Sequence, residues 1–296
     1  MNQDEDPFDC FGDGDSDHDN EDDRRAGQSR NSASLSLQHR DPSNGILAFH
    51  AGTEQALINY VQKQLLASDN NVLKTPASKV LGHIDDFCLK RHWMMHVGYE
   101  KSPILEKFLK ECKETTAPDA EKTLALVELG TYCGYSSILM ANALQAKLSC
   151  DHFEIYTVEV AEQNAKIARE MIKLSGLQDH IHVLLFDPNR ESLTDLLRRE
   201  MPPASTIDFL FLDHSKSMYL RDLQQLENSR FVQKGCFVAA DNVIFAQIDD
   251  YREYIAELAH RGIVRTQLKL SWLEYCEPDH NGDETKKNMM KDGIGK

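Results

Sequence analysis

The fold is indicated most clearly by residues 127–137, which read Val127-Glu128-Leu129-Gly130-Thr131-Tyr132-Cys133-Gly134-Tyr135-Ser136-Ser137. An apolar run that begins at Thr123 ends here, as expected for a buried strand. Two glycines four positions apart then allow the backbone to turn tightly and to approach a ligand closely. Ser136 opens a helix, where free N–H groups favour a carboxylate or phosphate. The stretch predicts a strand, a ligand-binding turn and a helix, although a plain glycine turn is the alternative.

On the C-terminal side of this turn, strand and helix patterns alternate. Such runs of buried strands joined by helices predict a doubly wound, mostly parallel sheet within an α/β domain. Residues 264–270 and 272–275 are predicted to form an antiparallel edge pair. The expected strands are 123–128, 154–160, 181–186, 207–212 and 235–240, and the expected helices are 136–145, 163–175, 190–200, 217–227 and 248–260.

On the N-terminal side, three helices are predicted before the first strand. One begins after Thr53, and the other two begin at Thr75-Pro76 and Ser102-Pro103, where proline suits the first helical position. We therefore expect one folded domain over residues 51–276. Residues 1–50 are expected to be a disordered acidic arm, able to dock a protein partner, and residues 277–296 a polar tail.

Composition narrows the class of protein. The chain has 296 residues, is 41% apolar and carries a net charge of −15. Residues 1–45 hold twelve acids and four arginines, which leaves −7 for the rest and disfavours a nucleic-acid partner. The sequence shows neither an apolar run long enough for a membrane span nor a secretory signal. The seven cysteines form no Cys-x-x-Cys pair, so we expect reduced thiols and a cytoplasmic location.

Polar residues follow the predicted strands at the edge where ligands bind in such sheets. Glu159 ends the second strand, where one carboxylate can accept hydrogen bonds from two ribose hydroxyls. Asp213 ends the fourth and is followed by Lys216, which places an acid and a base beside one pocket. Asp241 and Asn242 end the fifth, and together with Asp213 they offer the hard oxygen ligands that Mg²⁺ accepts. The alternatives are a solvent-facing Glu159 and a simple turn at Asp241-Asn242.

Together these residues resemble the catechol O-methyltransferase family over about residues 54–276. The resemblance rests on the order and spacing of six segments, which are Trp93-x-Met95-x-Val97-Gly98, Glu128-Leu129-Gly130-x-Tyr132-Cys133-Gly134-Tyr135-Ser136, Glu159, Leu212-Asp213-His214-x-Lys216, Ala240-Asp241-Asn242-Val243-Ile244 and Leu273-Glu274-Tyr275. It implies a Rossmann-like class I methyltransferase fold, with a mostly parallel seven-stranded sheet, an antiparallel edge strand and extra N-terminal helices.

The resemblance also implies a role for each matching position. Asp213, Asp241 and Asn242 would hold Mg²⁺. Lys216 would be the catalytic base, Glu274 would anchor the second hydroxyl of a small-molecule diol, and Trp93 and Asn242 would contact that substrate. The S-adenosylmethionine site would be lined by Val97, Glu128, Gly130, Tyr132, Tyr135, Ser136, Glu159, Val160, Asn189, Asp213 and His214.

The expected reaction is Mg²⁺-dependent methyl transfer to a catechol-type hydroxyl. Chelation of the hydroxyl by the ion would lower its pKa, Lys216 would take the proton, and the oxygen would attack the methyl group in line. The chain departs from the family pattern around the adenine and the acceptor, at Phe186-Asp187-Pro188-Asn189-Arg190, Ser215, Phe245-Ala246 and His96.

Two other functions fit the same residues. One is methylation of another phenolic diol of the caffeoyl type. The other is a non-catalytic scaffold that binds S-adenosylmethionine and docks partners through the acidic arm. Comparison of methyl transfer to several diols would distinguish a caffeoyl-type acceptor from a catechol. Lack of transfer to any diol would favour the scaffold.

Overall fold

The computed structural model describes residues 52–67, 76–116, 122–272, 275 and 291–294. Three helices come first along the chain: α1 (Thr53–Ala67), α2 (Pro76–Lys90) and α3 (Gly98–Thr116). Their order agrees with the three predicted helices. The predicted arm, residues 1–50, lies outside the described part of the chain.

The strand–helix alternation begins at β1 (Leu124–Leu129) and continues to α8 (Asp249–His260). The five strands form one sheet in the order β3-β2-β1-β4-β5, and every neighbouring pair is parallel. This confirms the predicted α/β fold with a parallel sheet. Between β1 and α8 the elements are α4 (Tyr135–Asn142) with a π-helical turn (Ala143–Lys147), β2 (Phe153–Glu159), α5 (Glu162–Ser175), β3 (Ile181–Leu185), α6 (Leu193–Glu200), β4 (Phe209–Leu212), a 3₁₀ turn (Lys216–Met218), α7 (Tyr219–Asn228) and β5 (Phe237–Ala240).

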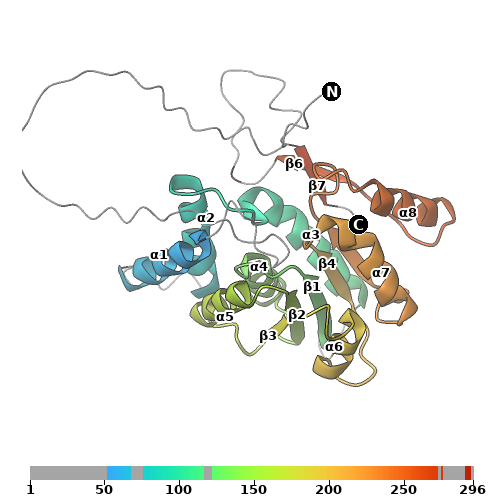
Figure 1. Ribbon diagram of the computed structural model, residues 1–296, viewed down its shortest axis with the longest axis horizontal. Helices are drawn as coiled ribbons and strands as arrows, with labels where there is room; N and C mark the ends of the chain where they lie inside the picture. The colour runs from blue at the N-terminus through green and yellow to red at the C-terminus, as the bar shows by residue number, and fades with distance from the viewer. Residues whose placement is uncertain (1–51, 68–75, 117–121, 273–274, 276–290, 295–296) are drawn as a thin grey trace, which may run out of the picture. The chain divides into compact units, whose positions relative to one another are not determined.

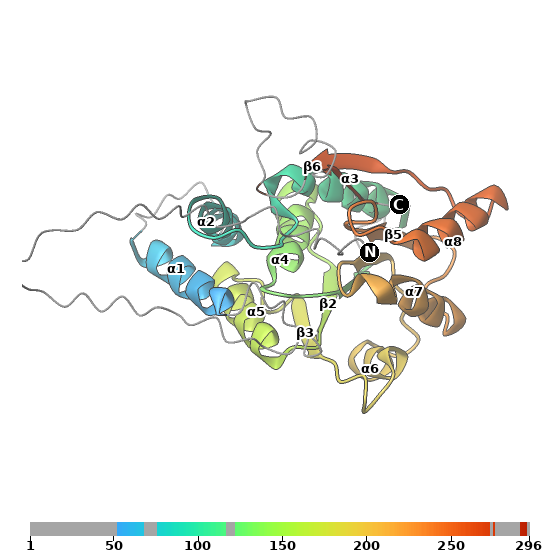
Figure 2. The same cartoon turned by 45° about the horizontal axis from the view of Figure 1, so that its top comes forward.

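Both faces of the sheet are covered by helices, which explains why its strands read as continuous apolar runs. In β1, Leu124 and Leu126 pack on one face with α1 to α5, whereas Val127 and Leu129 pack on the other with α6, α7 and α8. Figures 1 and 2 show α1, α2, α4 and α5 together on one side and α6, α7 and α8 on the other. The strand order changes direction between β1 and β4, because β2 and β3 follow on one side of β1 and β4 and β5 on the other. The C-terminal ends of β1 and β4 therefore form the edge of the sheet at which a ligand is expected to bind.

The strand count differs from the expected seven. The described residues form five strands in the parallel sheet and a separate antiparallel pair, β6 (Lys269–Trp272) with β7 (Lys291–Ile294). The predicted pairing of 264–270 with 272–275 is therefore wrong, and β7 comes from the segment predicted to be a polar tail. Ile263 and Leu268 are about half exposed, so the apolar pattern before β6 does not reflect burial in a sheet.

Helix α3 begins at Gly98, four residues before the predicted start at Ser102. Pro103 is accommodated inside the helix near its beginning, and the hydroxyl of Ser102 donates to the carbonyl oxygen of Gly98 at 2.6 Å. This earlier start places Lys101 in the helix and turns it toward β5, which α3 contacts. Among the described residues, no helix combines the length and the apolar character that crossing a bilayer requires.

Candidate active site

A buried carboxylate lies at the end of β1. Glu128 is fully buried and accepts hydrogen bonds from the hydroxyls of Ser136, Ser137 and, at 2.6 Å, Thr157. Two of these donors come from the start of α4 and the third from β2, so the turn after β1 is tied to both neighbouring elements. Burial raises the pKa of Glu128 to about 7, although the three hydroxyls oppose the shift.

The turn itself approaches the end of β4 very closely. Gly130 has a φ of 101°, and a Cβ at this position would lie 2.2 Å from the carbonyl oxygen of Asp213. Tyr132 has a φ of 48°, and Gly134, with a φ of 85°, precedes α4 as its N-cap. Glycine is thus required at position 130 by contact as well as by conformation, which brings the β1 turn against the start of the Asp213 segment.

Glu159 lies at the end of β2 beside this turn. One of its oxygens accepts from the backbone N–H of Tyr132 at 2.8 Å, and the other accepts from those of Val160 and Ala161. The carboxyl group is almost completely buried, and this burial raises its pKa to about 7. Val160 follows on the surface with 46% exposure. The turn after β3 begins beside Glu159, because the backbone N–H of Phe186 donates to the carbonyl oxygen of Glu159. Asn189 lies in this turn and is exposed.

The end of β4 carries an acid and an amine in direct contact. The Nζ atom of Lys216 lies 2.8 Å from Asp213 Oδ1 and 2.8 Å from the hydroxyl of Tyr219, to which it donates. Tyr219 is fully buried and donates in turn to the carbonyl oxygens of Leu212 and Asp241. The lysine is therefore held above the ends of β4 and β5.

Next to this pair, the ring of His214 stacks on Tyr219 with centroids 5.0 Å apart. Its Nε2 atom lies 3.0 Å from Asp222 Oδ2. Burial lowers the pKa of His214 despite this carboxylate, which favours the neutral imidazole. The interactions with Tyr219 and Asp222 fix the orientation of the ring.

The end of β5 brings a second acid to the same place. Asp241 N–H donates to Leu212 O at 3.0 Å, in register with the parallel pairing of β4 and β5. Asp241 is buried, and its charge raises the pKa of Asp213 in addition to the larger effect of burial. Asn242 is buried with a φ of 58°, a strained conformation for a residue other than glycine that is common at functional sites.

The donor set at these two strand ends suits a hard divalent cation. Two carboxylates and one amide, from Asp213, Asp241 and Asn242, are the oxygen ligands that Mg²⁺ takes while it retains several waters. In the described part of the chain, no group of three or more His, Cys, Asp or Glu side chains is arranged for a metal ion. The predicted set contains only two such residues, and each carboxylate contacts a lysine, Lys216 or Lys101.

The loop before α3 packs against the β1 turn. The ring of His96 lies 5.2 Å from that of Tyr132 and 5.4 Å from that of Tyr135, between centroids. Burial lowers the pKa of His96 to about 3, so the imidazole stays neutral. Val97 is buried next to it, and Trp93 packs partly buried against the core on the same side of the sheet. Glu274 lies outside the described residues.

Three buried groups of this site were missed by sequence reasoning: Lys101, Tyr219 and Asp222. Lys101 lies on the apolar stripe of α3, at positions 101, 105, 108 and 112. A lysine on such a stripe is unusual, and this could have identified it from the sequence as a buried residue. Tyr219 and Asp222 give no local signal, because a tyrosine and an acid at the start of an amphipathic helix are ordinary.

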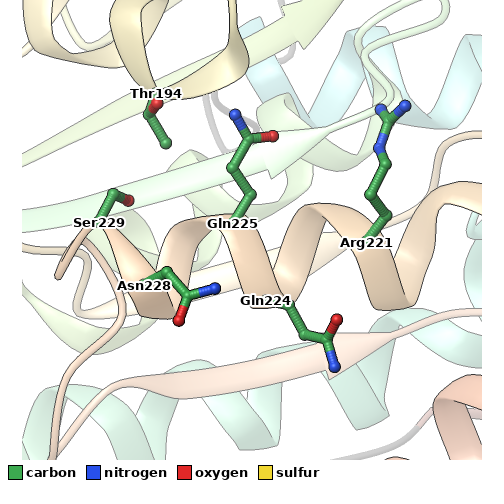
Figure 3. A pocket seen from close by; sticks show the side chains of 6 residues that line it. All are labelled: Thr194, Arg221, Gln224, Gln225, Asn228 and Ser229. Atoms are coloured by element: carbon green, nitrogen blue, oxygen red, sulfur yellow. The ribbon is translucent and has the colours of Figure 1, made fainter.

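A surface cavity of about 530 Å³, lined by residues with polar side chains, lies between α6 and α7 (Figure 3). Figure 3 shows Thr194 on α6 facing the side of α7 that carries Gln225, while Gln224 points away. None of the predicted site residues lines this cavity, whose lining residues are Thr194, Arg221, Gln224, Gln225, Asn228 and Ser229.

The fold is shared with solved methyltransferases. The O-methyltransferase of Bacillus cereus, solved with SAH, matches with a TM-score of 0.50 and 18% identity over 81% of this chain and 98% of that one. TomG of Streptomyces achromogenes, an O-methyltransferase solved with SAM, also has a TM-score of 0.50 and 18% identity, covering 76% and 92%. At these identities the likeness concerns the fold.

Sequence comparison then specifies the family. A family model described as O-methyltransferase matches residues 76–253. Bos taurus catechol O-methyltransferase is 32% identical over 233 residues, which are 78% of this chain and 75% of the relative. A probable O-methyltransferase of Mycobacterium tuberculosis is 32% identical over 75% of this chain and 82% of that protein. The chain belongs to the O-methyltransferase family and is, with it, an S-adenosylmethionine-dependent enzyme.

Proposed function

We propose that the chain transfers the methyl group of S-adenosylmethionine to a hydroxyl of a catechol or catechol-like diol, with Mg²⁺ held by Asp213, Asp241 and Asn242. The observation that carries this proposal is the contact of Lys216 with Asp213 beside Asp241, at the ends of neighbouring strands. An amine, two carboxylates and an amide thus lie at the ends of neighbouring strands, and Asp213 adjoins the turn after β1. The relatives named catechol O-methyltransferase support the choice of acceptor.

The cofactor would lie over the ends of β1 and β2. S-adenosylmethionine carries a cationic sulfonium and an amine, and Glu128 and Glu159 provide buried carboxyl groups at this edge. We infer that Glu159 contacts the ribose, because it ends the second strand and its carboxylate already accepts from the backbone N–H of Tyr132 in the turn after β1. Val97, Gly130, Tyr132, Tyr135, Ser136, Val160, Asn189 and His214 are the other proposed cofactor contacts.

In the proposed reaction, Lys216 accepts the proton of the attacking hydroxyl. Tyr219 positions the amine, since its hydroxyl accepts from Lys216 and is itself fixed by two backbone carbonyls. Glu274 would accept from the neighbouring hydroxyl and orient the ring, with Trp93 as part of the wall. Asp213, Asp241 and Asn242 would hold a divalent cation, which would supply the Lewis-acid chemistry that lowers the pKa of the reacting hydroxyl. Much of the rate would come from holding oxygen and methyl carbon in line.

The first experiment measures transfer of labelled methyl from S-adenosylmethionine to catechol, in Mg²⁺ and in EDTA. We expect Mg²⁺-dependent transfer that falls about 100-fold or more in Lys216→Ala, since a general base contributes this much. Lys147→Ala is the matched control, because Lys147 forms an exposed ion pair with Glu106. Resorcinol, whose hydroxyls cannot chelate one ion together, should be a poor acceptor. Cofactor binding without turnover of any diol would contradict the proposal and favour a scaffold.

A further inference from the structure

Lys101 is a completely buried lysine whose ammonium group contacts the proposed metal site. Its side chain has no exposed surface, and its Nζ atom lies 2.6 Å from Asp241 Oδ2. The other oxygen of Asp241 accepts from the backbone N–H of Asn242 at 2.9 Å. Because a buried lysine is costly unless it is paired, this contact stabilises both side chains.

The ammonium group is one of two that contact the carboxylates of the proposed site. Lys216 is paired with Asp213 at 2.8 Å on the other side. Two carboxylates that would repel each other when ionised are thus each in contact with a lysine.

The two lysines have different access to the site. Lys216 is partly exposed and can meet an acceptor hydroxyl, whereas Lys101 is enclosed between α3 and β5. Exchange of a proton with an acceptor is therefore a role for Lys216 alone. What Lys101 supplies is a fixed positive charge next to Asp241.

We propose that Lys101 is the internal counter-ion of the site: it holds Asp241 in place when no divalent cation is bound, and its charge lowers the affinity of Asp213, Asp241 and Asn242 for that cation. This inference rests on the proposed function, since it concerns the proposed Mg²⁺ ligands. A positive charge this close to a ligand carboxylate opposes the approach of a second cation, most strongly in a buried site. It also removes the repulsion that would otherwise separate the ends of β4 and β5.

Metal binding and stability of Lys101→Met test this inference in the full chain. Methionine keeps much of the length and apolar bulk of the side chain and removes its charge. We expect the Kd for Mn²⁺, measured by electron paramagnetic resonance, to fall about tenfold or more. Chemical denaturation in EDTA should show a less stable protein than the wild type, and Mn²⁺ should restore most of that loss.

Two further variants separate charge from packing. Lys101→Met combined with Asp241→Asn should regain stability in EDTA, because the uncompensated carboxylate is gone, and should bind Mn²⁺ weakly. Lys147→Met, at an exposed ion pair, should change neither quantity. If Lys101→Met does not fold in EDTA, refolding in Mn²⁺ gives the same information: rescue supports the counter-ion role, and failure of rescue by both Mn²⁺ and Asp241→Asn contradicts it.

The outcomes distinguish this inference from the proposed function. If the wild type binds Mn²⁺ and Lys101→Met binds it equally well or more weakly, the counter-ion role is overturned and the proposed metal site remains supported. If the wild type does not bind Mn²⁺ and Lys101→Met does, the counter-ion role is supported and the proposed Mg²⁺ requirement is overturned. Absence of binding in both proteins overturns both.

Discussion

Gly130 shows how a single position couples two strand ends. Its φ of 101° suits glycine, and an added Cβ would meet the backbone of Asp213 and His214 at 2.2–2.9 Å. We expect Gly130→Ala to lower the free energy of unfolding by at least about 2 kcal/mol, because backbone strain adds to displacement of the Asp213 segment. Denaturant titration measures the loss, and calorimetry should show weaker S-adenosylmethionine binding.

Gly176→Ala is the matched control for that prediction. Gly176 also has a positive φ, 74°, but no atom lies within 4 Å of a Cβ built there. It should cost about 1 kcal/mol from backbone conformation alone and leave cofactor affinity unchanged. Equal effects of the two substitutions would show that the close approach to Asp213 is unimportant.

Residues directly after buried strands could be predicted from the sequence, whereas residues that reach the site from helices could not. Asp213 and Asp241 were placed together because parallel strands end at one edge. Lys101 was missed because Ser102-Pro103 resembles a helix start, although the helix begins at Gly98. Tyr219 acts through its hydroxyl on two carbonyls, which depends on tertiary structure and has no local sequence pattern.

At the scale of elements, Tyr275 fixes the chain after β6 to α2 and α3. Its hydroxyl donates to Asp85 Oδ1 at 2.8 Å, and its backbone N–H donates to Glu100 Oε2 at 3.2 Å. The ring is buried and lies edge-on to Tyr99, with centroids 6.0 Å apart. These contacts join three segments that are far apart in the sequence.

The pH dependence of stability should report this contact. Burial raises the pKa of Asp85 from 3.8 to about 6, although hydrogen bonds from Tyr275 and Tyr135 oppose the shift. The folded protein therefore keeps this proton at pH values where the unfolded chain has lost it. The resulting stabilisation is complete below about pH 4 and is lost as pH rises through about 6, with a magnitude of about 1–3 kcal/mol.

Urea denaturation at pH 4.5 and pH 7.5 measures this effect by comparison of wild type with Asp85→Asn. Between pH 4.5 and pH 7.5, the free energy of unfolding should fall less in Asp85→Asn than in the wild type. Asp86→Asn is the control, since Asp86 pairs with Lys90 across an accessible turn of the same helix. If Asp85→Asn and wild type lose the same stability over this range, Asp85 is not the group responsible.

Elements with a clear period were predicted well, and elements that depend on distant pairing were not. The five parallel strands are covered on both faces and therefore appear as short apolar runs. The strand β7, with the sequence Lys-Asp-Gly-Ile, lacks such a run, and it pairs with β6 from almost twenty residues away. Hydrogen bonding between two segments so separated leaves no local pattern, so the sequence favoured a nearer partner for β6.

At the scale of the whole molecule, charge and core are unevenly distributed along the chain. Residues 1–45 carry a net charge of −8, whereas the buried residues of the described part extend from Glu54 to Tyr275. Removal of residues 1–50 is therefore expected to leave the melting temperature within about 3 °C, which corresponds to about 1 kcal/mol. Methyl transfer to catechol should be unchanged. A larger fall in melting temperature would show that this segment contributes to the core.

Glu100 and Lys101 are neighbours in the first turns of α3, and their side chains extend to different ends of the proposed site. Glu100 accepts from the Tyr275 backbone, and Lys101 donates to Asp241. If a bound acceptor displaces Tyr275, the change reaches the first turns of α3, which also hold Asp241 through Lys101. Thermodynamic reciprocity then requires that the acceptor and the cation change each other's affinity by an equal factor, so two consecutive residues of one helix would couple the two binding events.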